Sequence, residues 1–285
     1  MVNLGKNNIK NLIIDSLSCG SEKATDVVEI IKSTKPSTTK QAVYLALRNL
    51  IKEEVVIKYS KKVMLNQVWI NQLNEFVSKV DKNYLENYRG SKMKNELDKM
   101  AEGDRIIYLF KKLDSFDSFW NHIFSLIIKK TNILAPLYLY NPHEWFLFAR
   151  EKSEKYMYNW IKKNKPKTFY AIGGNNILDI AMRKKYSSEL IEFSTGEKMG
   201  FENNYYLAIL GNYLIETFLE KKLADRINII YNKFEKEKDA SDEIRKIMDE
   251  KSKFKIVVSV SSDKARKLKR RFEKIFFIPA DIKNL

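Results

Sequence analysis

Gln41, Tyr44 and Arg48 follow one another at steps of three and four residues, a spacing that puts them on one face of a helix. At about 100° per residue, this face lies roughly a third of a turn from a second, apolar face. The apolar face consists of Val43, Leu47, Leu50 and Ile51. Arginine pairs with guanine edges and glutamine with adenine edges, while Thr and Lys side chains reach phosphates. A helix with this polar face and this apolar face can pack on a protein core while it inserts into the major groove of DNA.

Chain breaks and caps define the elements that must position these residues. Lys35-Pro36-Ser37 interrupts the chain, and Thr38 or Thr39 then supplies a good N-cap for the helix. Two shorter helices are predicted before it, with one-sided apolar stripes at Ile9, Leu12, Ile13 and Leu17, and at Ala24, Val27, Val28 and Ile31.

A hairpin is predicted after the helix, which ends at Lys52-Glu53-Glu54. Residues 55–59 are rich in β-branched side chains and are predicted to form the first strand. Ser60-Lys61-Lys62 makes a polar turn, and residues 63–65 form the second strand. The tip of this hairpin is basic.

This order resembles the winged helix-turn-helix domain of prokaryotic transcriptional regulators, over about a quarter of the chain. The residues that carry the resemblance are Thr39-Lys40-Gln41-Ala42-Val43-Tyr44, Leu47, Leu50 and Val55-Val56-Ile57-Lys58. It implies a recognition helix over residues 38–48 and a wing that touches the DNA backbone or minor groove. The predicted DNA contacts are Thr38, Thr39, Lys40, Gln41, Tyr44, Arg48, Lys58, Lys61 and Lys62. A winged helix used only for protein contacts or dimerisation is the alternative.

The charge distribution favours a polyanionic partner. The chain of 285 residues has 52 Lys and Arg against 36 Asp and Glu, a formal net charge of +16. Residues 1–70 carry 11 basic and 6 acidic side chains, and residues 251–285 carry 11 and 3. Charge gathered at the two ends fits a binding surface better than a uniformly solvated shell, which is the alternative.

Membrane insertion and disulfide bonding are not expected. No apolar run approaches the ~18 residues of a membrane span, and the first residues lack the apolar stretch of a signal peptide. The single cysteine, Cys19, cannot form an internal disulfide or a thiolate metal cluster. We therefore expect a cytoplasmic protein.

A long amphipathic helix is predicted over residues 69 to about 100, with a stripe at Trp69, Leu73, Phe76, Val77, Val80 and Tyr84. We expect this helix either to pair with the same helix of a second copy in a homodimer or to pack on the C-terminal domain. The predicted organisation is thus a DNA-binding domain at 1–68, a helical linker at 69–102 and a third region at 103–285.

Strand-like and helix-like segments alternate over residues 103–285, which predicts an α/β domain with a sheet layered by helices. Residues 276–278 are expected to form its last strand. The fold class is therefore an α+β winged-helix domain followed by a long helix and an α/β domain. This architecture resembles regulators whose second domain is a phospholipase D-like sensor. The catalytic pattern His-x-Lys-x4-Asp of that family is absent at His122 and at His143, so the resemblance implies a sensor or scaffold.

The strand-to-helix junction at Gly173-Gly174-Asn175-Asn176 is the predicted ligand site of this domain. Two glycines let backbone amides approach a ligand, and a helix N-terminus favours an anion. A phosphate or small effector fits there, and a tight turn without a ligand is the alternative. His143-Glu144 is not a zinc motif, because Leu147 stands where a second histidine is needed. We predict no metal, no cofactor and no catalytic residue.

The basic segment Lys264-Ala265-Arg266-Lys267-Leu268-Lys269-Arg270-Arg271 is predicted to be a helix anchored by Leu268 and Phe272, with charges all around it. It adds phosphate contacts, binds RNA or is a solvated surface helix.

The leading hypothesis is a dimeric, sequence-specific DNA-binding regulator whose C-terminal domain senses an effector or a partner protein. One alternative is an antitoxin-like autoregulator whose C-terminal domain neutralises a partner enzyme. Another is a nucleic-acid-processing enzyme that holds a metal through Asp104, Asp114, Asp117 or Glu144.

Overall fold

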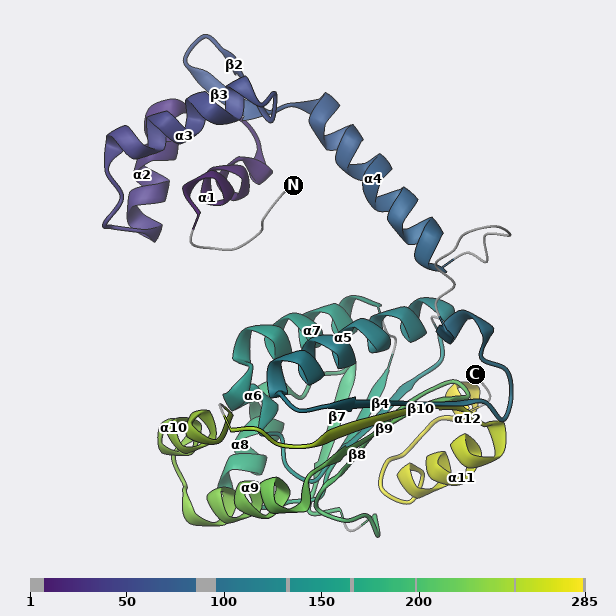
Figure 1. Ribbon diagram of the computed structural model, residues 1–285. Coiled ribbons are helices and arrows are strands. Elements are labelled where there is room, and N and C mark those ends of the chain that lie inside the picture. Colours follow the sequence, from purple (N-terminus) through teal and green to yellow (C-terminus); the bar gives the residue numbers. More distant parts are fainter. Residues whose placement is uncertain are drawn as a thin grey trace. The chain divides into compact units, whose positions relative to one another are not determined.

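The computed structural model describes residues 8–85, 96–131, 134–164, 167–197, 199–248 and 250–283. The chain divides into two units, Met1–Met93 and Lys94–Leu285, which Figure 1 draws in purple to blue and in teal to yellow. Each unit has its own hydrophobic core, and each is described by itself.

The first unit consists of short helices followed by a small sheet. The helices are α1 (Ile9–Ser16), the 3₁₀ turn η1 (Leu17–Cys19), α2 (Ala24–Thr34) and α3 (Lys40–Lys52). A hairpin of β2 (Val56–Tyr59) and β3 (Lys62–Leu65) follows, and the two-residue strand β1 (Glu22–Lys23) pairs with β3. The antiparallel sheet order is β1-β3-β2. Three helices and then a hairpin is the order that the sequence predicts.

Amphipathic periodicity explains how these helices pack. The apolar stripes of α1, α2 and α3 meet in one buried cluster that also takes in strand residues of the hairpin, and its fully buried members include Ile13, Val27, Ile31, Val43, Leu50 and Val63. Burial of such side chains contributes on the order of 1.5–3 kcal/mol each before entropy is counted. The same packing fixes which side of α3 faces outward.

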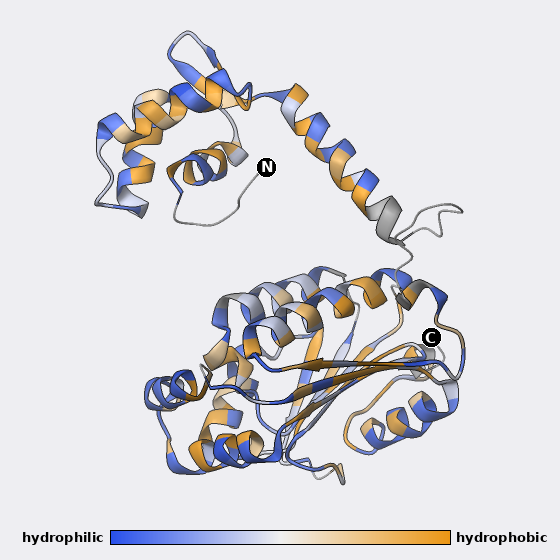
Figure 2. Cartoon of the chain, in the orientation of Figure 1, coloured by the Kyte–Doolittle hydropathy of each residue, from blue (hydrophilic) through white to orange (hydrophobic). Residues whose placement is uncertain are grey.

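Helix α4 (Gln67–Leu85) follows the hairpin, and its hydrophobic and hydrophilic residues alternate along it in Figure 2. Phe76 is 63% exposed, and Val68 and Val77 are exposed as well. The predicted helix runs to about residue 100, and its stretch from 86 to 95 lies outside the described residues. Glu96–Lys99 forms the 3₁₀ turn η2 instead of a further α-helix, with Leu97 buried.

The second unit is built on a mixed seven-stranded sheet in the order β4-β10-β9-β8-β5-β6-β7. Its strands are β4 (Arg105–Phe110), β5 (Leu137–Asn141), β6 (Thr168–Ile172), β7 (Ile191–Thr195), β8 (Tyr205–Leu210), β9 (Tyr213–Leu219) and β10 (Phe254–Val260). β5, β6 and β7 are parallel, and the remaining pairings are antiparallel. Crossover connections through helices explain the parallel part.

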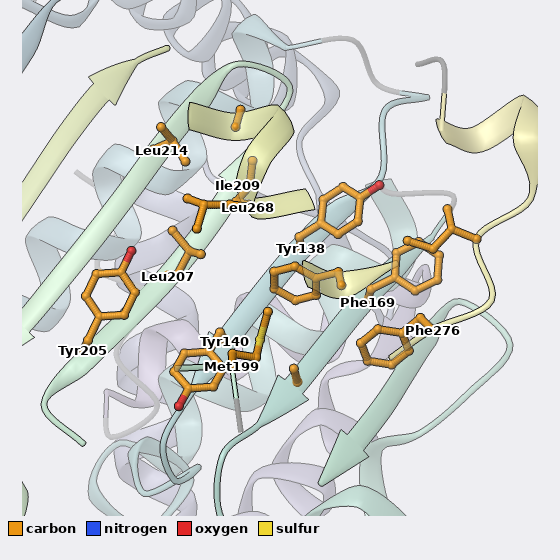
Figure 3. Close-up of a cluster of buried hydrophobic side chains, with 14 residues drawn as sticks. Tyr138, Tyr140, Phe169, Met199, Tyr205, Leu207, Ile209, Leu214, Leu268 and Phe276 are labelled. Atoms are coloured by element: carbon orange, nitrogen blue, oxygen red, sulfur yellow. The ribbon is translucent and has the colours of Figure 1, made fainter. Parts of the chain in front are cut away.

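Helices cover both faces of this sheet (Figure 1). α5 (Leu113–Lys130) and α7 (Glu151–Asn164) line one face together with Leu139 and Tyr170. α11 (Ser262–Phe272) covers the other face, where Leu268 and Phe272 pack with Tyr138 and Phe169 (Figure 3). The alternation of neighbouring strand residues between the two faces follows from the period of two in a strand.

The remaining helices are α6 (Phe146–Ala149), α8 (Ile177–Tyr186), α9 (Lys221–Lys233), α10 (Glu237–Met248) and α12 (Ala280–Lys283). α8 joins β6 to β7, and α9 and α10 lie in the connection from β9 to β10.

The predicted last strand at residues 276–278 is wrong. The chain there is irregular between α11 and α12 and pairs with no strand. Phe276 and Ile278 are nevertheless buried against the α11 face of the sheet (Figure 3). Phe276 and Ile278 point inward and Phe277 is exposed, although this segment is a loop. A loop that buries every second side chain has the same buried–exposed alternation as a short strand, so the sequence pattern alone cannot tell them apart.

No helix in the described part of the chain is long and apolar enough to cross a membrane.

Candidate nucleic-acid interface

Helix α3 begins where the sequence predicts it. Thr39 has extended backbone angles, and its hydroxyl oxygen accepts a hydrogen bond from the backbone N–H of Ala42 at 3.2 Å. This is the N-cap arrangement, which satisfies a backbone donor that the helix leaves unpaired. Val43, Ala46, Leu47 and Leu50 are buried and hold the helix against the rest of the unit.

The opposite side of α3 is open. Gln41 and Arg48 are exposed, and within the described residues neither has a hydrogen-bonding or ionic partner. Leu45 is 57% exposed and Asn49 is exposed on the same side. Sequence reasoning missed these two residues, although their spacing from Gln41 and Arg48 follows the same helical period. An exposed leucine among polar residues suits contact with a thymine methyl group, and asparagine suits adenine.

Tyr44 lies at the border between the two sides rather than at the centre of the open one. It is half-buried and packs against the core of the unit. The ammonium nitrogen of Lys40 lies 6.0 Å from the centroid of its ring. Only the outer part of the tyrosine is therefore available to a ligand.

Thr38, one of the predicted DNA contacts, is buried in the structure, so little of its side chain is available to a ligand. Its side chain is 7% exposed, and its hydroxyl has no partner within the described residues. The backbone N–H of Thr38 donates to the carbonyl oxygen of Lys35 in the turn after Pro36, which draws the side chain inward. A good N-cap residue type at a helix start does not tell which of two adjacent threonines faces solvent.

The hairpin tip is exposed and basic. Ser60 has a φ of 57°, the left-handed value required at the first central position of a two-residue type II′ turn. The turn exposes Lys58, Lys61 and Lys62, and it exposes 80% of Tyr59, which the sequence analysis did not select.

Most cations of α3 and the hairpin are not neutralised. Lys10 forms a salt bridge with Glu53. In contrast, no acidic partner occurs within the described residues for Lys40, Arg48, Lys52, Lys58, Lys61 or Lys62. Unpaired cations on the open side of a helix and on a neighbouring hairpin produce a positive potential that attracts a polyanion.

The glycines of the second unit lie at the end of β6, as predicted. Beta carbons added at Gly173 and Gly174 would lie 2.7 Å from the Tyr140 hydroxyl and 2.1 Å from Asp179 Oδ2. Both glycines are therefore required by the protein's own packing, whatever else they do.

The two asparagines after these glycines make contacts within the loop. Asn176 caps α8 by accepting from the Asp179 N–H, and Asn175 accepts from the Thr195 hydroxyl at 3.1 Å. These four residues line an open cleft of about 600 Å³ at the carboxyl ends of β5, β6 and β7.

His143 lies beneath this cleft as a buried, fully partnered side chain. Its Nδ1 is 3.0 Å from Asp179 Oδ2, and its Nε2 is 3.1 Å from Asn228 Oδ1. Its ring also stacks on Tyr231 with centroids 4.4 Å apart. Asp179 and Asn228 are distant from His143 in the chain, so no local sequence pattern indicates that these three side chains meet.

The carboxylates considered for a metal site are dispersed. Asp104 accepts from the backbone N–H of Ala101, and Asp114 and Asp117 both bind Arg150. Glu144 accepts hydrogen bonds from Tyr170 and Asn141. Across the described ranges, no cluster of three or more His, Cys, Asp or Glu is placed to hold a metal ion.

Helix α11 is anchored by Ala265, Leu268 and Phe272, as predicted for the last two. Its charges are more ordered than the sequence suggests. Lys264 binds Glu216, Arg271 donates to the Met199 carbonyl oxygen, and Lys269 lies 5.7 Å from the Tyr138 ring centroid. Lys267 and Arg270 remain on the outward side without an acidic partner in the described structure.

Comparisons with known proteins find similarity among solved structures alone. No family model matches the chain, and no curated protein matches it. Among solved structures, the chain is similar to TrmBL2, described as an archaeal chromatin protein that shows a novel mode of DNA binding. The match covers 93% of this chain and 90% of that chain, with 11% sequence identity and a TM-score of 0.33.

Proposed function

We propose that this protein is a sequence-specific DNA-binding transcriptional regulator, with the first unit acting as a winged helix-turn-helix domain. α3 enters the major groove, and the β2–β3 hairpin is the wing that contacts phosphates. The observation that carries the proposal is the outward side of α3, where Gln41 and Arg48 are exposed and unpartnered while the opposite side is anchored in the core.

Groove insertion requires a rigid helix with free hydrogen-bonding groups. The Thr39 cap and the buried side of α3 supply the rigidity, so little conformational entropy is lost by the backbone on binding. Arg48 offers a guanidinium that pairs bidentately with guanine, and Gln41 offers an amide that pairs with adenine. Leu45 and Asn49 lie on the same exposed side and widen this reading surface.

The wing supplies affinity rather than sequence preference. Lys58, Lys61 and Lys62 are exposed and have no acidic partners among the described residues, so each can neutralise a phosphate. Each neutralised phosphate releases counterions, which makes the affinity fall with increasing salt concentration.

We further propose that the regulator is a homodimer formed through α4. Phe76 and Val77 are exposed on this helix in the first unit and lie next to each other on its apolar stripe. Pairing with the same helix of a second copy buries these apolar side chains and places two α3 helices on one DNA duplex. The second unit then acts as the sensor or dimer-supporting domain. Light scattering of the full chain tests the dimer, and Phe76→Lys is expected to shift it to a monomer.

Selection of duplexes from a random pool by the full-length protein tests the DNA-binding proposal. Recovery of one enriched motif, bound at least tenfold more tightly than random duplex, is expected. Equal binding of every sequence contradicts sequence-specific regulation, and absence of binding at low salt contradicts DNA binding altogether.

A further inference from the structure

A second cavity, separate from the cleft at Gly173, lies on the face of the sheet opposite α11. It is bounded by α5, α7 and the strands β5, β6, β8 and β9, with a volume of about 70 Å³. Seven aromatic rings contribute to its wall: Phe116, Trp120, Phe124, Phe146, Tyr158, Tyr170 and Tyr206. We refer to it as the aromatic pocket. Since a cavity of about 150 Å³ accommodates benzene, this one has room for roughly three or four heavy atoms.

Besides the Asn141 amide and the tyrosine hydroxyls, three side chains with acceptor oxygens line the aromatic pocket. Asp117 of α5 and Glu154 of α7 line it from facing helices (Figure 1), and Thr217 of β9 lines it from the sheet. Thr217 is 2% exposed, and its hydroxyl has no partner within the described residues. The Glu154 carboxylate makes no hydrogen bond in the described structure, whereas Asp117 is held by Arg150 at 3.0 Å.

Acidic groups outnumber cations around this space. Glu144, which is 1% exposed, lies behind the ring of Tyr170 and accepts a hydrogen bond from its hydroxyl. Burial and the neighbouring carboxylates Glu144 and Asp117 raise the pKa of Glu154 well above its usual value. Three carboxyl groups thus surround the pocket with a single guanidinium, that of Arg150.

These features select one class of ligand. The faces of aromatic rings carry negative charge and attract cations, most strongly where water is excluded. An anion is repelled by the faces of the rings, and any carboxyl that ionises adds to this repulsion. A neutral apolar molecule leaves the half-buried Glu154 and the buried Thr217 hydroxyl without hydrogen bonds, which is costly for the buried group. Because no cluster of the described residues is placed to hold a metal ion, a cation that brings its own N–H donors fits best.

We propose that the aromatic pocket binds a small primary alkylammonium ion. The ammonium donates hydrogen bonds to the Glu154 carboxylate and the Thr217 hydroxyl, and the alkyl chain lies against the rings of Trp120 and Tyr206. This binding does not depend on the DNA-binding proposal. If both hold, the alkylammonium ion is an effector that acts on the second unit.

Titration calorimetry of the full-length protein with n-propylammonium chloride tests this proposal, with n-propanol as the neutral ligand of the same size. Four heavy atoms limit the Kd to roughly tens of micromolar at best, so the titration extends to about 20 mM at constant ionic strength. We expect saturable binding of n-propylammonium and at least tenfold weaker binding of n-propanol. Equal binding of the two compounds, or absence of binding, overturns the proposal.

Variants localise the site. Glu154→Gln removes the charge at the pocket and is expected to weaken n-propylammonium binding by on the order of tenfold or more. Glu151→Gln is the matched control, because Glu151 is on the same helix but is exposed and paired with Lys155. Trp120→Leu removes a ring without changing the charge, and it tests the site independently if Glu154→Gln fails to fold. Wild-type affinity in both pocket variants overturns the assignment.

Arg48→Ala separates this proposal from the DNA-binding one. It is expected to retain n-propylammonium binding and to lose DNA preference. Failure of one binding activity therefore leaves the other measurable.

Discussion

Gln41 and Arg48 lie two turns apart on the outward side of α3, both exposed and both without an intramolecular partner in the described structure. The residues between them that point inward, Val43 and Leu47, are fully buried. A helix that reads bases needs one side anchored in the core and the other side carrying side chains free to form hydrogen bonds. Substitutions on the exposed side of α3 therefore test the proposed DNA binding directly.

Replacing Arg48 with Ala is expected to weaken binding of the selected duplex by about 1–3 kcal/mol while changing random-duplex binding much less. The guanidinium contributes through base edges that only the selected sequence supplies. Fluorescence anisotropy on both duplexes measures the ratio of the affinity for the selected duplex to the affinity for random duplex. Lys163→Ala, which removes one positive charge from α7 in the second unit, is the control and should leave the ratio unchanged. An unchanged ratio in Arg48→Ala contradicts the reading role.

The role of Tyr44 is tested with a more conservative substitution than alanine. Because its ring packs against the core of the first unit, Tyr44→Ala also creates a cavity, with a cost of about 3 kcal/mol or more in a fully buried setting. Tyr44→Phe keeps the ring and removes only the hydroxyl. We expect near wild-type stability in urea denaturation and a loss of sequence preference wherever the hydroxyl contacts a base. A large stability loss in Tyr44→Phe contradicts the border position of this ring.

Lys61→Ala tests the wing. Its ammonium at the hairpin tip is expected to contact a phosphate, so the variant weakens selected and random duplexes equally. The slope of log affinity against log salt concentration should fall by about 1 in magnitude. Anisotropy titrations at several salt concentrations give the slope. A sequence-dependent loss in this variant instead assigns Lys61 to base contact.

Glu144 is expected to make stability depend on pH. Burial raises its pKa to about 8 in the folded protein, against 4.5 in the unfolded chain. Between these values the folded state holds a proton that the unfolded state has lost, so stability falls as pH rises through this window, by on the order of a few kcal/mol at most.

Glu144→Gln removes this titration. Its stability relative to wild type is therefore expected to improve from pH 5 to pH 8.5 in urea denaturation. Glu235→Gln, at an exposed position on the same unit, should show no such trend. Parallel pH curves for wild type and Glu144→Gln contradict a buried protonated carboxyl.

Binding of n-propylammonium should tighten with pH. The pKa of Glu154 is raised by burial and by Glu144 and Asp117, with Arg150 opposing them, so the free pocket binds protons that the cation displaces. The ligand itself stays charged below about pH 10. Affinity is expected to rise from pH 6 to pH 8.5, and calorimetry in buffers of different ionisation enthalpy should detect proton release. Tighter binding at pH 6 is the contrary result.

Gly174→Ala tests the packing at the β6–α8 junction. The new methyl carbon falls 2.1 Å from Asp179 Oδ2 and 2.5 Å from the His143 ring, both of which are buried and paired with each other. Since both side chains are buried and bonded to each other, we expect a loss of about 2–3 kcal/mol of unfolding free energy. An unchanged denaturation midpoint shows that the His143–Asp179 pair is not rigid.

The sequence by itself determined a helix or strand wherever a regular spacing of apolar residues is followed by a residue that ends the element. The apolar stripes of α1, α2 and α3, the break at Pro36 and the β-branched residues of the hairpin are local features, and local sterics and amphipathicity suffice to read them. The same reasoning placed most strands of the second unit, but it produced a false strand at residues 276–278, where Phe276 and Ile278 are buried without pairing.

Only the tertiary structure decided which side chains are free and which groups meet. It buried Thr38 and left Thr39 as the cap, moved Tyr44 to the border of the open side, and added Leu45 to it. It also joined His143 to Asp179, and Asp117 to Glu154 across the aromatic pocket, from positions far apart in the chain. Burial, partnership and pKa depend on contacts between distant segments, and a local pattern in the sequence carries no information about those contacts.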